Sequence, residues 1–370
     1  MLSTLLRNKY YLIYAFSLFL SANPYFCWGT NISMLCILLC SILSFLNIKL
    51  SYLSLLYLPI YLYLFYRLSE FPLGVRIIRF LPILILFTSR KFLSCVTFYY
   101  KRILALFLVP SLIVYILLLC GIDLKHEAIS PLNMLKDYNY LRYPFLVVPN
   151  ILHISSLRFC GYFDEPGVIG TFCIILLYLD NYNLRKWYNL VFFISGIFSY
   201  SLFFFLLSFI YIFTSKIRYF FLISLFLFAA SYTLKDTEIV QALLLNRLEV
   251  KDGVISGNNR ESDSFQKFYQ NFKNTPEYYW GLGGGTSATT YNIGGASYKD
   301  LIVDYGLLFY LFFLLFYLVQ IVCLKQKNRY KILSAILLLS TIYQRPFILD
   351  FIYVYLIFLP FYSIVQDVDN

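Results

Sequence analysis

The sequence predicts an all-α, polytopic membrane protein, and three observations lead to this fold class. Hydrophobic residues make up 60% of the 370-residue chain, whereas charged residues make up 13%. Apolar runs such as 103–120, 219–232 and 307–324 approach or reach the roughly 20 residues that a helix needs to cross a bilayer. Charged residues gather between these runs. We therefore expect one integral membrane domain over residues 1–370.

About twelve membrane-spanning helices are expected. Their ranges are 10–28, 31–46, 50–66, 73–88, 103–120, 167–180, 187–200, 201–215, 217–233, 301–324, 331–344 and 347–364. Arg7 and Lys9 precede the first range as in a signal peptide, but spans continue at once, so we expect an uncleaved helix. The apolar run 188–215 is expected to break near Ser199–Ser201, because one long helix would place the basic segment 325–331 outside.

The basic residues are unevenly distributed, and their placement predicts the topology. With the N-terminus inside, the cytoplasmic segments hold 15 of the 30 Lys and Arg residues and 3 of the 19 acidic residues. The acidic residues are Asp180, Asp367 and Asp369, and the basic ones are Arg7, Lys9, Lys49, Arg90, Lys91, Lys101, Arg102, Arg185, Lys186, Lys216, Arg218, Lys325, Lys327, Arg329 and Lys331. This positive-inside pattern accounts for the net charge of +11, so we expect no nucleic-acid partner. Both termini are then cytoplasmic, and two long polar loops, about 121–166 and 234–300, lie outside.

The first polar loop ends in a dense group of charged residues. Arg158 lies six residues before Asp164 and Glu165, and Pro166 opens the next span. One interpretation is structural: Asp164 or Glu165 caps the positive end of the helix that Pro166 begins, and Arg158 snorkels or pairs with one of them. The other is functional, because a guanidinium at the membrane surface binds phosphate in a bidentate manner.

The second polar loop carries two more Arg residues and a glycine-rich segment. Arg247 follows an apolar span, and Arg260 lies in a turn-like Gly/Asn stretch before a predicted helix over 261–273. The segment that contains Gly281 and Gly283 has neither P-loop nor dinucleotide-binding spacing. Its backbone amides are expected to approach an anionic ligand, with a flexible loop as the alternative.

A further Arg lies between the last two predicted spans. Arg345 precedes a helix-breaking Pro, and a structural ion pair with Asp350 is the alternative to a binding role. The Arg residues at 158, 247, 260 and 345 converge on one membrane face and suggest a phosphorylated lipid as ligand. No Cys/His/carboxylate cluster has metal-ligand spacing, so we expect no metal and no cofactor.

These residues resemble the O-antigen polymerases (Wzy) of the O-antigen ligase/polymerase superfamily. The matching positions are Arg158, Gly161, Glu165, Pro166 and Gly167 in the first loop and Arg260, Gly281 and Gly283 in the second. The resemblance implies a GT-C-like helical bundle in the bacterial inner membrane. It implies a glycosyltransferase that polymerises undecaprenyl-diphosphate-linked repeat units on the periplasmic face by block transfer. Its partners would be those lipid-linked glycans, the bilayer, a chain-length regulator and a flippase.

The resemblance also implies roles for individual residues. The catalytic set is Arg158, Glu165 and Arg260, and the substrate-binding set is Asp164, Arg247, Gly281, Gly283 and Arg345. Related ligases use a His in the second loop, whereas the two His residues here, His126 and His153, lie in the first, which favours a polymerase. The general base is open between Glu165 and Asp164, with His153 next. An O-antigen ligase or a lipid-linked oligosaccharide flippase is the alternative function.

Overall fold

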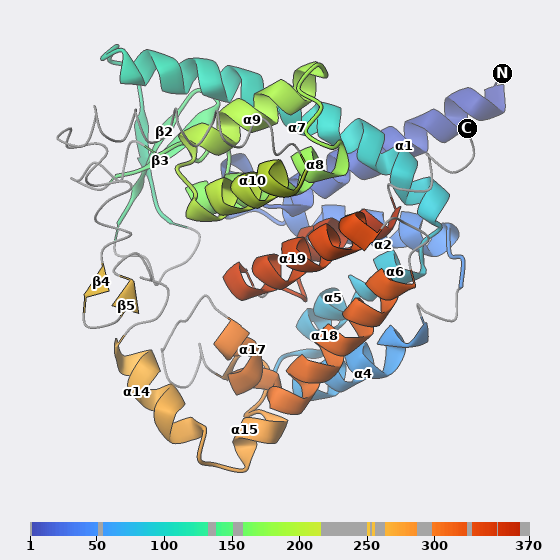
Figure 1. Ribbon diagram of the computed structural model, residues 1–370. Coiled ribbons are helices and arrows are strands. Elements are labelled where there is room, and N and C mark those ends of the chain that lie inside the picture. The colour runs from blue at the N-terminus through green and yellow to red at the C-terminus, as the bar shows by residue number, and fades with distance from the viewer. Residues whose placement is uncertain are drawn as a thin grey trace. The chain divides into compact units, whose positions relative to one another are not determined.

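The computed structural model describes residues 2–50, 55–131, 138–150, 158–215, 250–251, 254–255, 263–286, 298–323, 328–345 and 347–362. Helices dominate these residues, as predicted, and two small sheets lie in the polar loops (Figure 1). Among the described helices, α7 (Arg90–Leu119) alone is long and apolar enough to cross a bilayer, and six other apolar helices have 10–17 residues. The predicted twelve spans stay a prediction.

The chain forms two compact units, and each unit combines separate parts of the sequence. The first unit consists of Met1–Ala22, Asn31–Tyr100 and Arg260–Asn370, and the second of Asn23–Thr30 and Lys101–Asn259. Helix α7 therefore begins in the first unit and continues into the second. The single membrane domain expected from the sequence stays a prediction.

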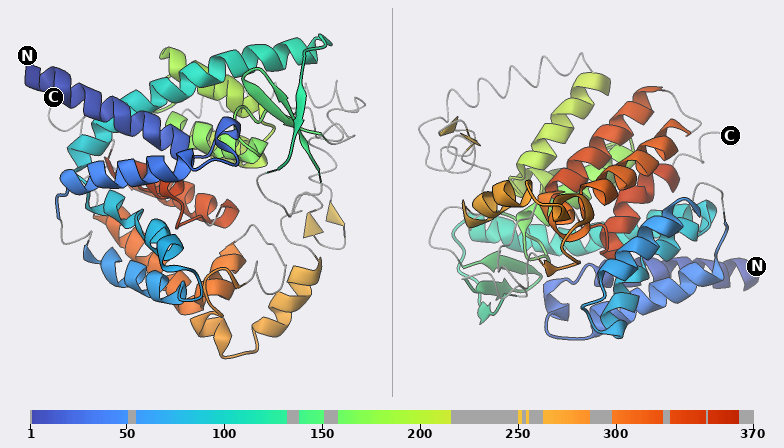
Figure 2. Two further views of the ribbon diagram at one scale, coloured as in Figure 1. Left: turned by 180° about the vertical axis from the view of Figure 1, so that it is seen from behind. Right: turned by 90° about the horizontal axis from the view of Figure 1, so that it is seen from below.

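The first unit begins with two helices that pack along each other, drawn in blue in Figure 2: α1 (Leu2–Ser21) and α2 (Ile32–Leu46). A buried hydrogen bond of 2.8 Å joins the hydroxyls of Tyr14 and Ser44 across this pair. Besides the start of α7, the other described helices of the unit are α4 (Tyr57–Arg67), α5 (Leu73–Phe80), α6 (Ile83–Phe87), α14 (Asp263–Phe272), α15 (Glu277–Trp280), α17 (Tyr298–Tyr305), α18 (Leu307–Val322), α19 (Asn328–Gln344) and α20 (Phe351–Tyr362). Helix α14 confirms the helix predicted over 261–273.

Two predicted spans of the first unit are interrupted. The span 73–88 is two short helices, because Pro82 has no amide hydrogen with which to continue α5. The span 301–324 is α17 followed by α18, and the break falls at Gly306, whose φ is +92°. Only glycine adopts this backbone conformation readily.

The second unit is built around three short helices. They follow the motif at the end of the first polar loop, residues 158–167, which we call the first motif. They are α8 (Pro166–Leu179), α9 (Trp187–Phe198) and α10 (Leu202–Ser215), and α8 packs against both of the others. The chain turns between α9 and α10 at Tyr200, whose φ is +46°. This turn confirms the predicted break near Ser199–Ser201.

The polar loops of the second unit contain strands, which the sequence analysis did not predict. In the first loop, β1 (Glu127–Ile129), β2 (Tyr140–Tyr143) and β3 (Leu146–Pro149) form an antiparallel sheet in that order. Strands β4 (Val250–Lys251) and β5 (Val254–Ile255) form a short hairpin. A 3-10 turn, η1 (Tyr25–Cys27), contacts the first motif through the Tyr25 amide, which donates to the Tyr162 carbonyl (2.8 Å).

Candidate functional site

The glycine-rich segment Gly281–Thr286 uses its main-chain amides inside the first unit. Each of the six amides donates one hydrogen bond of 2.6–3.2 Å. In chain order, the acceptors are the carbonyls of Glu277, Val303, Asp304 and Arg67, then the Asp304 carboxylate, then the Gly283 carbonyl. The amides therefore already have protein acceptors, which does not support the predicted amide cradle for an anion. The substrate-binding role of Gly281 and Gly283 stays a prediction.

Glycine at these positions allows close contact between backbones. Gly281 has φ +80°, and a Cβ there would lie 2.5 Å from the Asp304 carbonyl oxygen. A Cβ on Gly284 would lie 2.6 Å from Leu68 at the end of α4. The glycines thus allow the segment to pack closely against the end of α4 on one side and against the α17–α18 turn on the other.

Arg67, in the last turn of α4, is a site residue that the sequence analysis missed. Its guanidinium Nη2 donates to the Gly281 carbonyl (2.5 Å), and its own carbonyl accepts the Gly284 amide (2.9 Å). One residue therefore holds the segment from both sides. The signal in the sequence was three Arg residues, Arg67, Arg76 and Arg79, within a largely apolar region, where ionisable residues indicate function.

Further charges surround Tyr305 at the end of α17. Asp304, Arg79, Asp350 and Arg67 all act electrostatically on its hydroxyl. We call Arg67, Arg79, Asp304, Tyr305 and Asp350 the Tyr305 cluster. Asp350 is exposed just before α20, and the Arg79 charge acts on its carboxylate.

Arg345 lies directly after α19. It is 7% exposed, its amide donates to the Thr341 carbonyl (2.7 Å), and its guanidinium lies over the Phe347 ring at 6.0 Å. The burial places a permanent charge inside the protein, which is costly without compensation. The Arg79 charge acts on Asp350, and the ion pair of Arg345 with Asp350 stays a prediction.

Arg158, in the second unit, binds the end of a helix. Its Nε donates to the Ser199 carbonyl (3.0 Å) and its Nη2 to the Tyr200 carbonyl (3.1 Å). These carbonyls follow α9, where the helix dipole is negative and a cation is stabilising. Arg158 thus joins the first motif to the turn between α9 and α10.

The two acids of the first motif lie at the start of α8. Glu165 is the N-cap residue with an extended backbone, so it lies at the predicted position at the positive end of α8, although its side chain makes no capping hydrogen bond. The Asp164 carbonyl accepts the buried Tyr140 hydroxyl of β2 (2.6 Å). The first-loop sheet therefore positions the backbone just before the helix.

The structure distributes the predicted site residues between the two units. Arg158, Asp164 and Glu165 come together in the second unit, and Gly281, Gly283 and Arg345 lie in the first. Arg247, Arg260 and His153 lie outside the described residues. In the part of the chain that is described, no group of three His, Cys, Asp or Glu side chains could hold a metal ion.

A second charged group missed from the sequence lies where α7 meets the turn after α8. Asp180 accepts from Lys101 at 2.9 Å and from Lys186 at 3.2 Å, and only about a tenth of the Asp180 and Lys101 side chains is exposed. Burial alone would raise the pKa of Asp180, but the two Lys charges bring it below its ordinary value. The sequence placed all three residues on the cytoplasmic side without predicting this contact.

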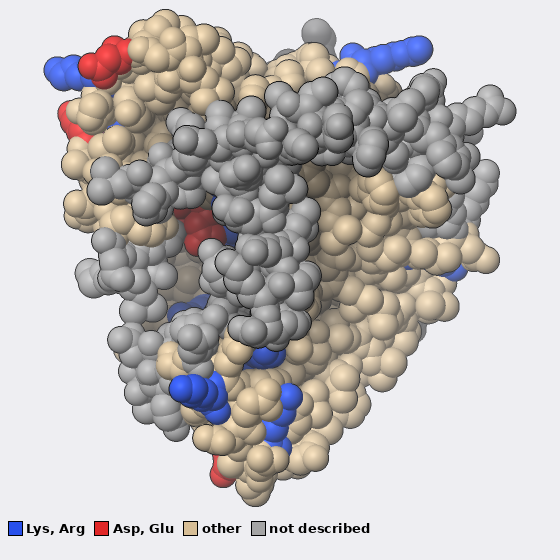
Figure 3. Space-filling view, turned by 60° about the vertical axis from the view of Figure 1, so that its left-hand side comes forward, with Lys and Arg blue, Asp and Glu red and all other residues tan. Residues whose placement is uncertain are grey.

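Among the described residues on the face in Figure 3, the Lys, Arg, Asp and Glu side chains form small groups among uncharged residues. Comparisons with protein-family models, with curated proteins and with solved structures found no match to the chain. The site is therefore interpreted from its own geometry and from the resemblance of its two motifs.

Proposed function

We propose that the chain is a multi-pass protein of a bacterial inner membrane, with both termini in the cytoplasm. Support comes from large apolar side chains that face outward, such as Phe45 (64% exposed), Leu46 (71%) and Leu106 (61%). Exposing such groups to water costs about 25 cal/mol per Å². A hydrocarbon environment removes this cost, and large apolar patches are typical of surfaces that are covered in the cell.

Within that membrane we propose a polymerase of undecaprenyl-diphosphate-linked repeat units that acts on the periplasmic face. The observation that carries this proposal is the placement of two guanidinium groups at the ends of apolar helices: Arg67 bonds to the glycine-rich segment, and Arg79 acts electrostatically on the Tyr305 hydroxyl. Guanidinium groups fixed in this way suit a diphosphate, which they bind by charge-assisted hydrogen bonds. Arg158 beside the start of α8 supplies a second such group.

In the proposed reaction, a hydroxyl of one lipid-linked unit attacks the anomeric carbon of the reducing-end sugar of the growing chain. The new C–O bond forms as the bond from that carbon to the diphosphate oxygen breaks, and the lipid diphosphate leaves with the bonding electrons. Glu165 or Asp164 accepts the hydroxyl proton. Arg158 and Arg260 stabilise the charge on the leaving group, by about 3–4 kcal/mol each if they act like oxyanion-hole donors.

A deletion strain tests this proposal through its surface polysaccharide, separated on a gel. A polymerase deletion leaves the lipopolysaccharide core capped by one repeat unit, and the gene restores the ladder when supplied on a plasmid. An uncapped core with accumulated lipid-linked polymer would indicate the ligase alternative. An uncapped core with accumulated single lipid-linked units would indicate the flippase alternative.

A further inference from the structure

The first motif is buried over its first part and reaches the surface at its two acids. Four residues before the acids are at most 2% exposed: Phe159, Cys160, Tyr162 and Phe163. Asp164 and Glu165 are half-buried, so part of each acid is accessible to a ligand. The motif therefore presents its carboxylates at the point where the chain leaves the core.

Backbone hydrogen bonds fix the buried part of the motif from three elements. The Phe159 amide donates to the Phe198 carbonyl at the end of α9 (2.9 Å), and the Gly161 carbonyl accepts from the Val147 amide of β3 (3.0 Å). The turn η1 donates to the Tyr162 carbonyl (2.8 Å). The backbone is thus fixed by other backbone groups as far as Tyr162, before the acids begin.

A side chain, that of Tyr140 in β2, makes the contact at the acids themselves. Its hydroxyl donates to the Asp164 carbonyl (2.6 Å), and the residue is completely buried in a cluster with Val147 and Cys160. The Trp28 ring contacts the Tyr140 ring edge-on, with 5.3 Å between the centroids. Burial raises the pKa of Tyr140, so its hydroxyl stays protonated and serves as a fixed hydrogen-bond donor.

The position of this hydrogen bond determines where both carboxylates stand. The Asp164 carbonyl and the Glu165 amide form one planar peptide group, and the plane contains the Cα atoms of both acids. Glu165 has the extended backbone of an N-cap residue (φ −144°, ψ 139°), and α8 begins at the next residue. A donor that fixes the carbonyl oxygen therefore fixes both Cα atoms relative to the positive end of α8.

We propose that Tyr140 is a positioning residue, which keeps the catalytic carboxylate of the first motif, Glu165 or Asp164, in place for proton transfer. This inference rests on the proposed function and deepens it, because it assigns a residue of the first-loop sheet to the reaction. A neutral hydrogen bond contributes only about 1 kcal/mol to stability, whereas a displacement of about 1 Å at a reacting group can cost about 100-fold in rate. The rate is therefore the more sensitive measure of this contact.

The test removes the hydroxyl by Tyr140→Phe, which keeps the ring in the core. Purified protein in detergent is supplied with radiolabelled lipid-linked repeat units extracted from the deletion strain, and kcat and KM are measured separately. We expect kcat per folded molecule to fall about tenfold or more while KM stays within about twofold of wild type, because the groups that bind substrate remain and the proton acceptor is displaced.

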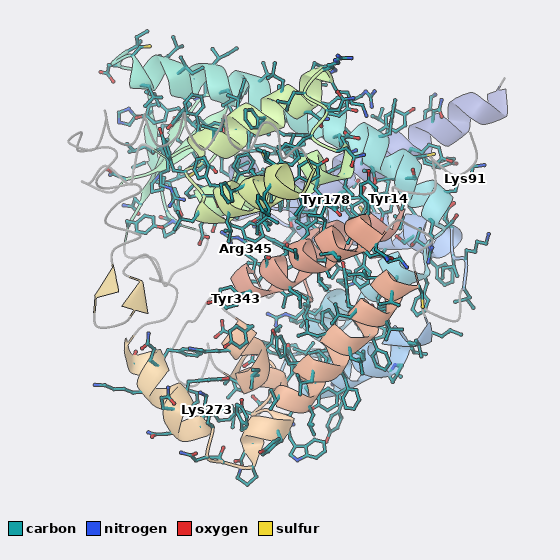
Figure 4. The ribbon with its side chains drawn as sticks, viewed as in Figure 1. Tyr14, Lys91, Tyr178, Lys273, Tyr343 and Arg345 are labelled. Atoms are coloured by element: carbon teal, nitrogen blue, oxygen red, sulfur yellow. The ribbon has the colours of Figure 1, made fainter. Side chains whose placement is uncertain are left out.

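Tyr182→Phe is the matched control, because it also removes a buried, hydrogen-bonded hydroxyl from the second unit. The hydroxyls of Tyr182 and Ser208 share a hydrogen bond of 2.7 Å. Tyr182 follows Tyr178, which is labelled in Figure 4 and lies in the last turn of α8, so it is about 20 Å along the helix from the first motif. This variant should keep its kcat. An equal fall in kcat for both variants would attribute the effect to lost stability and overturn the positioning role.

A double-mutant cycle shows whether Tyr140 acts through a carboxylate. If the acceptor is Glu165, Tyr140→Phe should change the residual kcat by less than about twofold in the Glu165→Gln background, where no carboxylate is left to position. If the acceptor is Asp164, the same result is expected in the Asp164→Asn background. Equal losses of kcat in the wild-type background and in both variant backgrounds would overturn the positioning role.

Failure of this inference can be told apart from failure of the proposed function. Wild-type protein that joins no lipid-linked units rejects the function, and the inference with it. Wild-type protein that makes polymer, together with an unchanged kcat in Tyr140→Phe, supports the function and rejects the positioning role.

Discussion

The two motif segments differ in where their charges come from. Arg158, Asp164 and Glu165 belong to one short stretch, and the charged side chains lie within the motif itself. The segment Gly281–Thr286 contains no charged residue, and it is bound by Arg67 from a distant part of the chain and by Asp304 of α17. The first motif carries its own functional groups, whereas the second is a scaffold beside which other helices place theirs.

This difference separates two ways in which a motif can contribute to an anion site. In the first motif, substitution of a side chain removes a charge and leaves most of the backbone in place. In the second, substitution of a glycine moves the backbone and with it the position of Arg67 and of the Tyr305 cluster.

Gly281→Ala should strongly destabilise the first unit. The added Cβ meets the Asp304 carbonyl, and the positive φ is unfavourable for alanine, so the combined cost is about 3 kcal/mol. Thermal unfolding in detergent measures it. Gly74→Ala is the matched control, because no atom lies within 4 Å of its added Cβ and its φ is not positive. Equal melting temperatures for the two variants would contradict the scaffold role.

Arg158→Ala should abolish polymer while the protein stays folded. The loss of its two hydrogen bonds to the Ser199 and Tyr200 carbonyls costs about 1–3 kcal/mol of stability, which a folded membrane protein tolerates. The ladder, compared at equal membrane abundance, measures activity. Arg158→Lys keeps the charge without the planar fork and should restore little. A full ladder from Arg158→Ala would assign this residue a purely structural role.

Asp180→Asn should destabilise the second unit by roughly 3 kcal/mol, because it leaves Lys101 buried without its partner. Since the pKa of Asp180 is lowered by folding, its contribution is present above the unfolded value of about 3.9 and is lost as the pH falls through the folded value. The difference in free energy of unfolding between wild type and Asp180→Asn should therefore become smaller below about pH 4. Glu127→Gln is the control, since Glu127 and Arg142 form an exposed pair, and it should change stability by less than about 1 kcal/mol. A difference in unfolding free energy that stays the same at every pH would contradict a lowered pKa of Asp180 in the folded protein.

Excess chelator should leave polymerisation unchanged, because we expect Arg158 and Arg260 to balance the charge of the diphosphate. The measurement is turnover of purified protein with lipid-linked units, with and without EDTA. Activity that disappears with EDTA and returns with magnesium would contradict the metal-free scheme and require a cation in addition to the Arg residues.

Local features of the fold could be predicted from the sequence. The break near Ser199–Ser201 followed from the charge distribution of the loops around it, and the helix over 261–273 followed from its start signals. Pro82 and Gly306 are local signals for a helix break. The long apolar runs around them nevertheless led us to predict one continuous span in each region. The strands of the first loop are three or four residues long and too short for a clear alternating pattern.

The contacts of the candidate site could not be predicted in the same way. The hydrogen bond from Arg67 to Gly281 joins residues that are 214 positions apart, and no local pattern specifies such a pair. Composition does reveal that a charge in an apolar region is unusual, but it does not reveal the partner. The contacts of Arg158 and of the glycine-rich segment could not be predicted, because they are made to helix ends and to backbone groups whose positions depend on the fold.

The link between Arg67 and the glycine-rich segment also determines when the first unit can be completed during synthesis. At about 5–20 residues per second, roughly 10–40 s pass between the emergence of Arg67 and that of Gly281. Most of the second unit, Lys101–Asn259, is made in that interval. The hydrogen bond from Arg67 at the end of α4 to the Gly281 carbonyl can therefore form only after most of the second unit has been made.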